Sequence, residues 1–254
     1  MTIRIATAPV CWGIFEFEGA VQRYTPDQVL DQIKEAGYDA LEYGPWGFMP
    51  SDPVVLQAAL DARGLKLLSS FVPVPLVDPA RHDEALANAL KFGRVLAACG
   101  AHHVVLADDS GSVPELVKQA GRRSGSLLDA AAWAIVGEAV NRIAREIHDQ
   151  LGLETVFHHH CAGYVETPEE TARCSMPPIR RWSGCALIPA TITSPVATPS
   201  SAFISTANGC ATCISRTSTR PSRKPATRTR PTTSRRLNAA CSANWATAQS
   251  ISPA

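Results

Sequence analysis

The chain lacks acidic residues over its last third. All 23 Asp and Glu residues lie at or before Glu170, and none of the 84 residues that follow is acidic. Residues 174–254 carry 10 of the 24 Lys and Arg residues, so residues 1–173 hold 14 basic against 23 acidic side chains. The overall net charge of +1 is therefore an average over two unlike segments, and it predicts little about partners.

Other absences narrow the class of protein. No run of about 18 apolar residues occurs, which argues against a membrane-spanning helix. The N-terminus enters a strand-like run at Ile3 and has no signal-peptide pattern. Cys210 and Cys213 form a CxxC pair, but no second pair follows at zinc-site spacing. We therefore expect a cytoplasmic protein with no membrane partner.

Residues 174–254 allow two interpretations. They consist largely of Ser, Thr, Arg, Pro and Ala, and they show no apolar periodicity. The first interpretation is a disordered basic arm, which would bind nucleic acid or an anionic surface. The second is a coding sequence translated out of frame, because these residue types are what a GC-rich gene tends to yield in a wrong frame.

The degeneracy of the genetic code favours the second interpretation. In a shifted frame, each codon consists of the last base of one present codon and the first two bases of the next. Among the codons possible for Leu187–Ser194, some would encode Asp-Thr-Gly-His-Tyr-His-Phe in that frame, and some of those possible for Ala211–Thr217 would encode His-Leu-His-Phe-Lys-Asp. The same shift over Ala239–Ser252 permits a segment that includes Val-Phe-Cys-Glu-Leu-Gly. Three matches in one frame restore the strands, acids and histidines that are missing, so we predict a lost base near Arg173 and a poorly ordered tail.

Residues 1–173 alternate short apolar runs with longer segments of helical period. Strands are predicted at 3–9, 39–43, 66–72, 103–107 and 154–158. Helices are predicted at 26–36, 52–63, 82–99 and 126–151, with another helical segment opening at 167–170. Strands that are each followed by a helix indicate repeated βα units and a parallel sheet.

Doubly wound sheets and barrels share this rhythm. A doubly wound nucleotide-binding fold has a glycine-rich loop after its first strand, but Cys11-Trp12-Gly13 stands there instead. Functional side chains recur just after several strands, at Trp12, Glu42, Asp108 and His158, and a barrel opens all such positions onto one face. We therefore expect an α/β fold, a (β/α)8 TIM barrel that is incomplete after residue 173.

The run Phe157-His158-His159-His160 is the strongest local signal for chemistry. In an extended run, His158 and His160 point to one side and His159 to the other. Two imidazoles at a strand end suit a divalent metal or an acid/base pair. Histidines that merely satisfy a polar strand end would give the same pattern.

Carboxylates and aromatic rings supply further candidates. Glu42 ends a predicted strand beside aromatic residues, where it would bind sugar hydroxyls or act as a base. Glu166 follows His160 by six residues and is within reach of the same strand end, although it also suits an exposed position before a helix. Trp12 and Trp46 form an apolar wall for a ring substrate or pack at the barrel rim.

Asp108 leaves two alternatives open. Asp108 and Asp109 follow the fourth predicted strand directly. One alternative is a contact from Asp108 to the substrate, and the other is a solvated pair of loop carboxylates.

Three stretches resemble one enzyme family. Ile5–Gly13, Leu41–Pro50 and Phe157–Thr167 look like the sugar-phosphate isomerase/epimerase family of xylose-isomerase-like barrels, and within it they are most similar to the inosose (2-keto-myo-inositol) dehydratases. The resemblance covers essentially all of residues 1–173, and the out-of-frame segments extend it. It implies a metal-dependent lyase or isomerase that acts on a cyclic polyol ketone or ketose through an enolate. The implied metal is Mn²⁺ or Co²⁺, with Mg²⁺ or Zn²⁺ as alternatives.

The resemblance also implies roles for single residues. His160 matches a metal position at which many family members have Glu, whereas Glu42, His158 and Glu166 are catalytic candidates. Trp12, Trp46 and Asp108 are candidate substrate contacts. The remaining metal ligands of the family would fall opposite Ile188, Thr191, Ile214 and Asn244, none of which can replace them.

The chain as written is therefore expected to be an impaired enzyme for a small polyol or sugar. The first alternative is a sugar or sugar-phosphate isomerase or epimerase. The second, from a different class, is a non-catalytic barrel fragment whose basic tail binds nucleic acid. A homo-oligomer is compatible with each of these interpretations.

Overall fold

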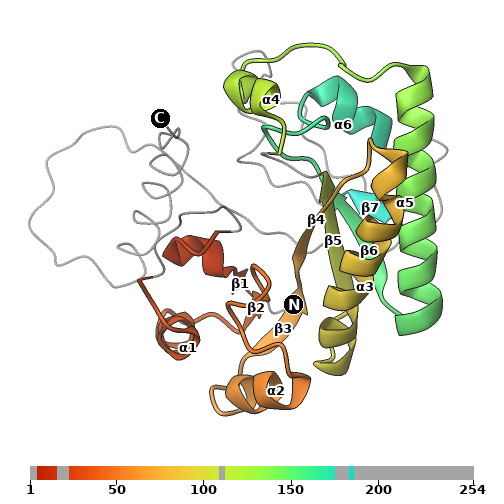
Figure 1. The fold of residues 1–254 in the computed structure, drawn as a ribbon. Coiled ribbons are helices and arrows are strands. Elements are labelled where there is room, and N and C mark those ends of the chain that lie inside the picture. Colours follow the sequence, from red (N-terminus) through yellow and green to blue (C-terminus); the bar gives the residue numbers. More distant parts are fainter. Residues whose placement is uncertain (1–4, 16–22, 109–111, 175–182, 186–254) are drawn as a thin grey trace, which may run out of the picture. The chain divides into compact units, whose positions relative to one another are not determined.

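The computed structural model describes residues 5–15, 23–108, 112–174 and 183–185, which Figure 1 draws as a ribbon. They fall into two compact units, one formed by residues up to Leu68 and the other beginning at Ser69. Residues 186–254 lie outside the described part. The predictions for Cys210 and Cys213, for the shifted ligand positions and for the order of this segment are therefore untested.

The first unit is a short three-stranded sheet with two α-helices. Its elements are β1 (Ala6–Thr7), the 3-10 helix η1 (Pro9–Trp12), α1 (Pro26–Glu35), β2 (Ala40–Glu42), α2 (Pro53–Asp61) and β3 (Lys66–Ser69). The strand order is β1-β2-β3, and β1 runs parallel to β2 with Ala6 opposite Ala40.

Helix α1 begins where its sequence predicts. Thr25 accepts a hydrogen bond from the Gln28 amide at 3.3 Å, and the Gln28 side chain accepts one from the Thr25 amide at 2.8 Å. This reciprocal capping box, with Pro26 at the first helical position, satisfies amides that a helix start otherwise leaves without partners.

A close backbone approach follows β2. Gly44 has φ +80°, and a Cβ placed there would lie 2.8 Å from the Pro9 Cγ. Only glycine fits this conformation and this gap, so the residue fixes the path of the chain just beyond Glu42.

The second unit is a parallel sheet covered by long helices. Its elements are β4 (Phe71–Val74), η2 (Pro79–Arg81), α3 (His82–Ala98), β5 (His103–Asp108), α4 (Pro114–Gln119), α5 (Ala130–Leu151), β6 (Glu154–His158), α6 (Pro168–Cys174) and β7 (Ser183–Cys185). The strand order is β4-β5-β6-β7, and each neighbouring pair is parallel. Helices α3 and α5 pack against each other beside this sheet (Figure 1).

Glycine 93 permits the close packing of α3 on α5. A Cβ at Gly93 would lie 2.7 Å from the Leu151 Cδ1 and 3.1 Å from the Ile147 Cδ1. Alanine is the better helix former by about 1 kcal/mol, so this glycine is explained by packing and not by helix propensity.

Most predicted elements are present, with differences at their ends. The strand predicted at 154–158 has those bounds, whereas the one predicted at 66–72 is interrupted at Ser70 and becomes β3 and β4. The first strand ends at Thr7, because the chain turns at Pro9 into η1. The sequence did not predict η2 or α4. Ser183–Cys185 forms β7, which is an exception to the irregular structure expected after residue 173.

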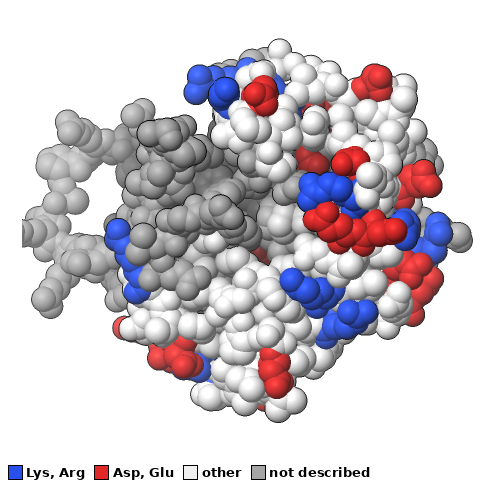
Figure 2. All heavy atoms as spheres, viewed as in Figure 1, with Lys and Arg blue, Asp and Glu red and all other residues white. Residues whose placement is uncertain are grey.

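Charged side chains of both signs are intermixed on the surface. Figure 2 shows Lys and Arg lying among Asp and Glu over the described residues. Arg142 pairs with Asp83 and Arg81 with Glu84, both at 2.7 Å. Within the described part of the chain, no helix is both long and apolar enough to span a membrane.

Candidate active site at the end of strand β6

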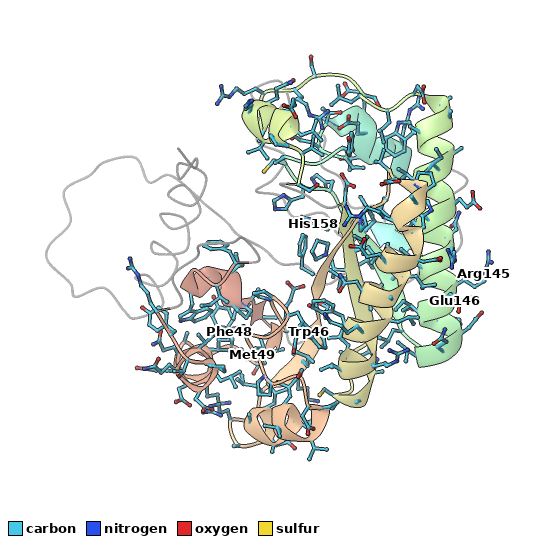
Figure 3. The ribbon with its side chains drawn as sticks, viewed as in Figure 1. Trp46, Phe48, Met49, Arg145, Glu146 and His158 are labelled. Atoms are coloured by element: carbon cyan, nitrogen blue, oxygen red, sulfur yellow. The ribbon has the colours of Figure 1, made fainter. Side chains whose placement is uncertain are left out.

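Three aromatic rings meet where β6 ends. β6 lies between β5 and β7, and His158, paired with Ala107 of β5, is its last residue (Figure 3). The ring centroids of His158 and His160 are 5.5 Å apart. The Phe71 ring, from β4, lies 5.7 Å from His158 and 5.9 Å from His160. Contact of both imidazoles with one ring agrees with their predicted position on the same side of the strand.

The hydrogen bond of His160 defines its tautomer. Its Nδ1 lies 2.7 Å from the Cys161 carbonyl oxygen, which can only accept, so Nδ1 carries the proton and the lone pair is on Nε2. Burial lowers the pKa of His160, and the Cys161 carbonyl and the Glu166 carboxylate oppose this effect only in part. At neutral pH the ring is therefore uncharged and can accept a proton at Nε2.

His159 follows β6 directly and is buried. The residue is 1% exposed, and neither ring nitrogen has a hydrogen-bond partner within the described residues. Burial, and to a smaller extent the neighbouring His160, lower the pKa of His159 to about 4. A buried imidazole of this kind is stable only in its neutral form.

His159 should make the protein sensitive to acid. Its folded pKa of about 4 lies below the ordinary 6.5, so the unfolded chain binds more protons between these values. The stability from neutral His159 is complete above pH 6.5 and is lost as the pH falls toward 4, about 3 kcal/mol in all. Urea unfolding between pH 8 and pH 4 should show this loss. His159→Phe should reduce it, whereas His102→Phe at an exposed site should not; equal pH slopes in the parent and His159→Phe would contradict the assignment.

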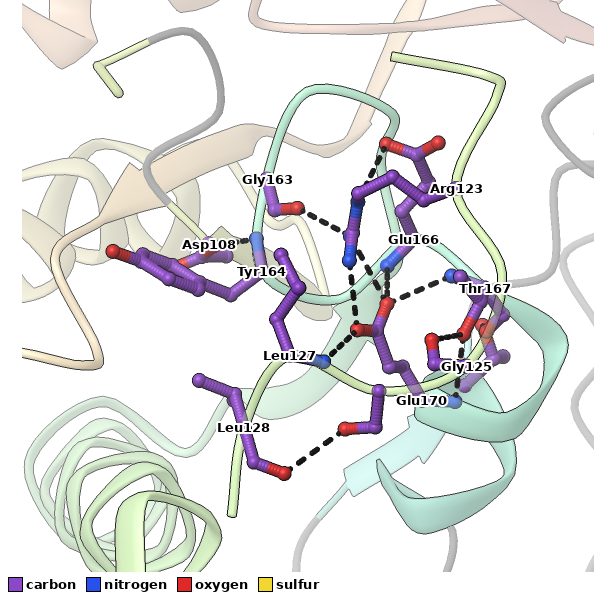
Figure 4. A network of polar contacts seen from close by, with 12 residues as sticks. Asp108, Arg123, Gly125, Leu127, Leu128, Gly163, Tyr164, Glu166, Thr167 and Glu170 are labelled. Atoms are coloured by element: carbon purple, nitrogen blue, oxygen red, sulfur yellow. Dashed lines mark hydrogen bonds and ion pairs between the residues drawn. The ribbon is translucent and has the colours of Figure 1, made fainter. Parts of the chain in front are cut away.

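Buried charges surround the loop that follows β6 (Figure 4). Arg123 donates to both oxygens of Glu170, at 3.0 and 3.1 Å, and the two side chains are 2% and 0% exposed. Glu170 also accepts from the amides of Leu127, Glu166 and Thr167. Burial alone would raise the pKa of Glu170, but Arg123 and these amides lower it overall.

Glu166 belongs to the same network. Its Oε1 accepts from the Gly121 amide at 2.6 Å, and its Oε2 accepts from the Ala162 amide at 2.9 Å and lies 3.8 Å from the Arg123 Nε. The side chain is 7% exposed. Both oxygens of the acid that the sequence predicted to be catalytic therefore already bind the protein backbone.

Asp108 is not part of a solvated loop pair. It is 5% exposed, and its Oδ2 accepts from the Tyr164 amide at 2.6 Å. The solvated alternative is thus wrong for Asp108, which ties the end of β5 to the loop after β6. Asp109 lies outside the described residues, and the predicted contact between Asp108 and substrate stays a prediction.

The other candidates belong to the first unit. Trp12 is 5% exposed, and its indole Nε1 donates to the Gln32 side chain at 2.8 Å. Trp46 is 37% exposed and packs obliquely against Tyr43 at 5.9 Å (Figure 3). Glu42 is half-buried at the end of β2. The predicted meeting of Trp12, Glu42 and His160 at one rim involves both units and stays a prediction.

The described residues do not fit a complete metal centre. Among them, no group of three or more His, Cys, Asp and Glu side chains is arranged to hold a metal ion. Catalytic divalent sites use about three protein ligands, and His158 with His160 would supply two. The role predicted for His160 as a metal ligand therefore has no support from neighbouring donors in this part of the chain.

The sequence did not single out Arg123. It lies in Gly-Arg-Arg-Ser-Gly, where nothing distinguishes a buried arginine from its exposed neighbour Arg122. Glu170 was predicted only as part of the helical segment that opens at 167–170. The 47-residue separation of this pair is long-range, so local pattern carries no signal for it.

Comparison with known proteins identifies similar enzymes. No protein-family profile matches the chain. The inosose dehydratase of Geobacillus kaustophilus is 31% identical over 171 residues, which are 67% of this chain and 54% of that protein. The rhizopine catabolism protein MocC of Rhizobium meliloti is 32% identical over 179 residues, 68% of this chain and 52% of that protein. The chain thus spans about half the length of these relatives.

Solved structures share the fold at low sequence identity. A xylose isomerase-like TIM barrel protein from Mycobacterium smegmatis, in complex with magnesium, gives a TM-score of 0.54 at 20% identity, covering 72% of this chain and 64% of that one. The probable 3-DHS dehydratase AsbF of Bacillus anthracis gives 0.58 at 10% identity, covering 78% and 67%. The IOLI protein, with a bound zinc atom, gives 0.50 at 12% identity, covering 72% and 62%. The chain therefore has the fold of xylose-isomerase-like TIM barrels, and its sequence is similar to inosose dehydratases.

Proposed function

We infer that residues 1–173 derive from a dehydratase that removes water from a cyclic polyol ketone. The observation that carries this proposal is the neutral imidazole of His160, with its lone pair on Nε2, beside His158 at the carboxyl end of β6. In a barrel this end of the strands holds the active site. The similarity to inosose dehydratases supports the substrate class.

The reaction needs a base and an acid on neighbouring carbons. His158 or His160 would remove the proton on the carbon next to the ketone, and the electron pair of that C–H bond would move onto the ketone oxygen as an enolate. The enolate would then re-form the ketone while a C=C bond forms between the α and β carbons and the β C–O bond breaks. The β-hydroxyl group would leave as water with a proton returned by the protonated imidazole. Glu42 and Asp108 are the carboxylate candidates for contact with the hydroxyls.

An isomerase or epimerase would begin with the same proton transfer. It would return the proton to carbon and keep the hydroxyl group, so the atoms of substrate and product would be equal. The comparisons support a dehydratase or an isomerase/epimerase at this coarser level. Product analysis by mass separates the two, because only the dehydratase product is lighter by one water.

We further propose that the chain as written is impaired by a shifted reading frame. The acids stop at Glu170, and the 171-residue match to the Geobacillus protein is about as long as residues 1–173. The described residues also fail to complete a metal centre. Sequencing of the DNA around codon 173, in independent isolates, tests this proposal; a stop codon early in the shifted frame would contradict it.

The proposed roles can be tested in a chain with the frame restored. Glu42→Gln and His160→Ala should each lower turnover of inosose by about 10²–10⁴-fold, because each removes a group proposed to act in proton transfer or substrate contact. His160→Ala should also weaken divalent-metal binding, measured by calorimetry. Glu169→Gln, at an exposed acid near the same loop, is the matched control. Full turnover in either test variant would remove that residue from the mechanism.

A further inference from the structure

One residue of the loop after β6 has a strained backbone. Ala162 has φ +69°, and among the described residues it is the one non-glycine residue with a positive φ. This conformation brings the Cβ of an L-residue close to its own backbone and costs about 1–2 kcal/mol. It persists only when surrounding contacts hold it, and such strain gathers at functional sites.

The contacts that hold this turn come from Glu166 and Arg123. Glu166 accepts from the Ala162 amide through one oxygen and from the Gly121 amide, between α4 and α5, through the other. Arg123 donates to the Gly163 carbonyl at 2.8 Å, and its Nε faces Glu166 at 3.8 Å (Figure 4). The turn is thus tied on two sides to the connection between α4 and α5.

The same turn carries His160. The His160 amide donates to the Val165 carbonyl at 3.1 Å, which closes the loop, and its ring Nδ1 binds the carbonyl of Cys161, the residue before Ala162. Release of the Ala162 amide would let this backbone relax toward negative φ. The Cys161 carbonyl would then turn, and the His160 ring would lose its orientation.

We propose that Glu166 is a positioning residue whose carboxylate holds the strained turn at Ala162 and thereby fixes the ring of His160. This changes the role that the sequence suggested, because both oxygens of this carboxylate already bind backbone amides. The importance of the ring rests on the proposed dehydration, but the positioning itself is measurable without turnover. Failure of the positioning proposal is therefore distinguishable from failure of the proposed dehydratase function.

The test uses the full chain and the substitution Glu166→Gln. A glutamine presents one acceptor and one donor, so one of the two amides is left facing an N–H group. We expect hydrogen exchange of the Ala162 amide to rise about tenfold and the ring ¹H–¹³C peak of His160 to move. The peak is assigned by its loss in His160→Gln. Glu169→Gln should leave both unchanged. The proposal would be overturned if the His160 peak did not move and the Ala162 amide exchanged at the same rate as in the parent protein.

A second variant covers the case in which Glu166→Gln does not fold. Ala162→Gly keeps every hydrogen bond and removes the steric cost of positive φ. We expect it to raise the melting temperature and, when combined with Glu166→Gln, to recover part of the lost exchange protection. A lower melting temperature would show that Ala162 does not carry the strain, and the proposal would be wrong.

Discussion

Restoring one base near codon 173 is expected to turn an inactive chain into a metal-binding enzyme. In the shifted frame the tail permits Asp-Thr-Gly-His, His-Leu-His-Phe-Lys-Asp and a later Glu, which are absent from the sequence as written. The repaired protein should bind a divalent cation and turn over inosose at about 1–1000 per second, whereas the present chain should show negligible turnover.

Two comparisons make this experiment decisive. A chain that ends at residue 173 should be as inactive as the present one, because both lack the same donors. A repaired chain in which the restored Asp-Thr-Gly-His is changed to Asn-Thr-Gly-Gln should fold but bind metal weakly. Turnover of inosose at enzymatic rates by the unrepaired protein would show that its tail is functional and that the proposed frame is wrong.

Arg123→Met is expected to destabilise the second unit by about 3–5 kcal/mol. The substitution removes the positive charge between Glu166 and Glu170, whose side chains are 7% and 0% exposed, and leaves buried carboxylates without a counter-ion. Chemical unfolding at pH 7, followed by circular dichroism, measures this loss. Methionine retains most of the volume of arginine, so the effect reports charge more than packing.

The pH dependence of this variant has a definite sign. In the parent, the folded pKa of Glu170 lies below its ordinary value, so its contribution to stability is present above about pH 4.5 and is lost as the pH falls further. Arg123→Met removes the strongest of the interactions behind this contribution, and its deficit should therefore shrink in acid. Arg142→Met is the control, since its pair with Asp83 is largely exposed and should contribute about 0–1 kcal/mol. Equal losses in the two variants would contradict the assignment.

The βα rhythm and the cluster at β6 were predictable, but the polar network was not. Strand 154–158 and helix α1 follow from a local apolar pattern and a capping box, which act over a few residues. The pairing of Arg123 with Glu170 and of Asp108 with Tyr164 joins residues 47 and 56 positions apart. No periodic pattern records such contacts, because they depend on which loops the sheet order brings together. For the same reason nothing in the sequence indicated that Glu166, a catalytic candidate from its position after His160 and from the resemblance, binds the Gly121 amide.

The close approach at Gly93 limits how this protein can be recombined with its relatives. Gly93 of α3 has no side chain, and the space beside it is filled by methyl groups of Leu151 and Ile147, in and near the last turn of α5. A chimera that imports α3 from a homologue with alanine at this position would require the Leu151 and Ile147 side chains to move, unless α5 came with it. The two helices are therefore better exchanged together, and a crossover point between them would give a less stable hybrid even though each segment folds well in its own parent.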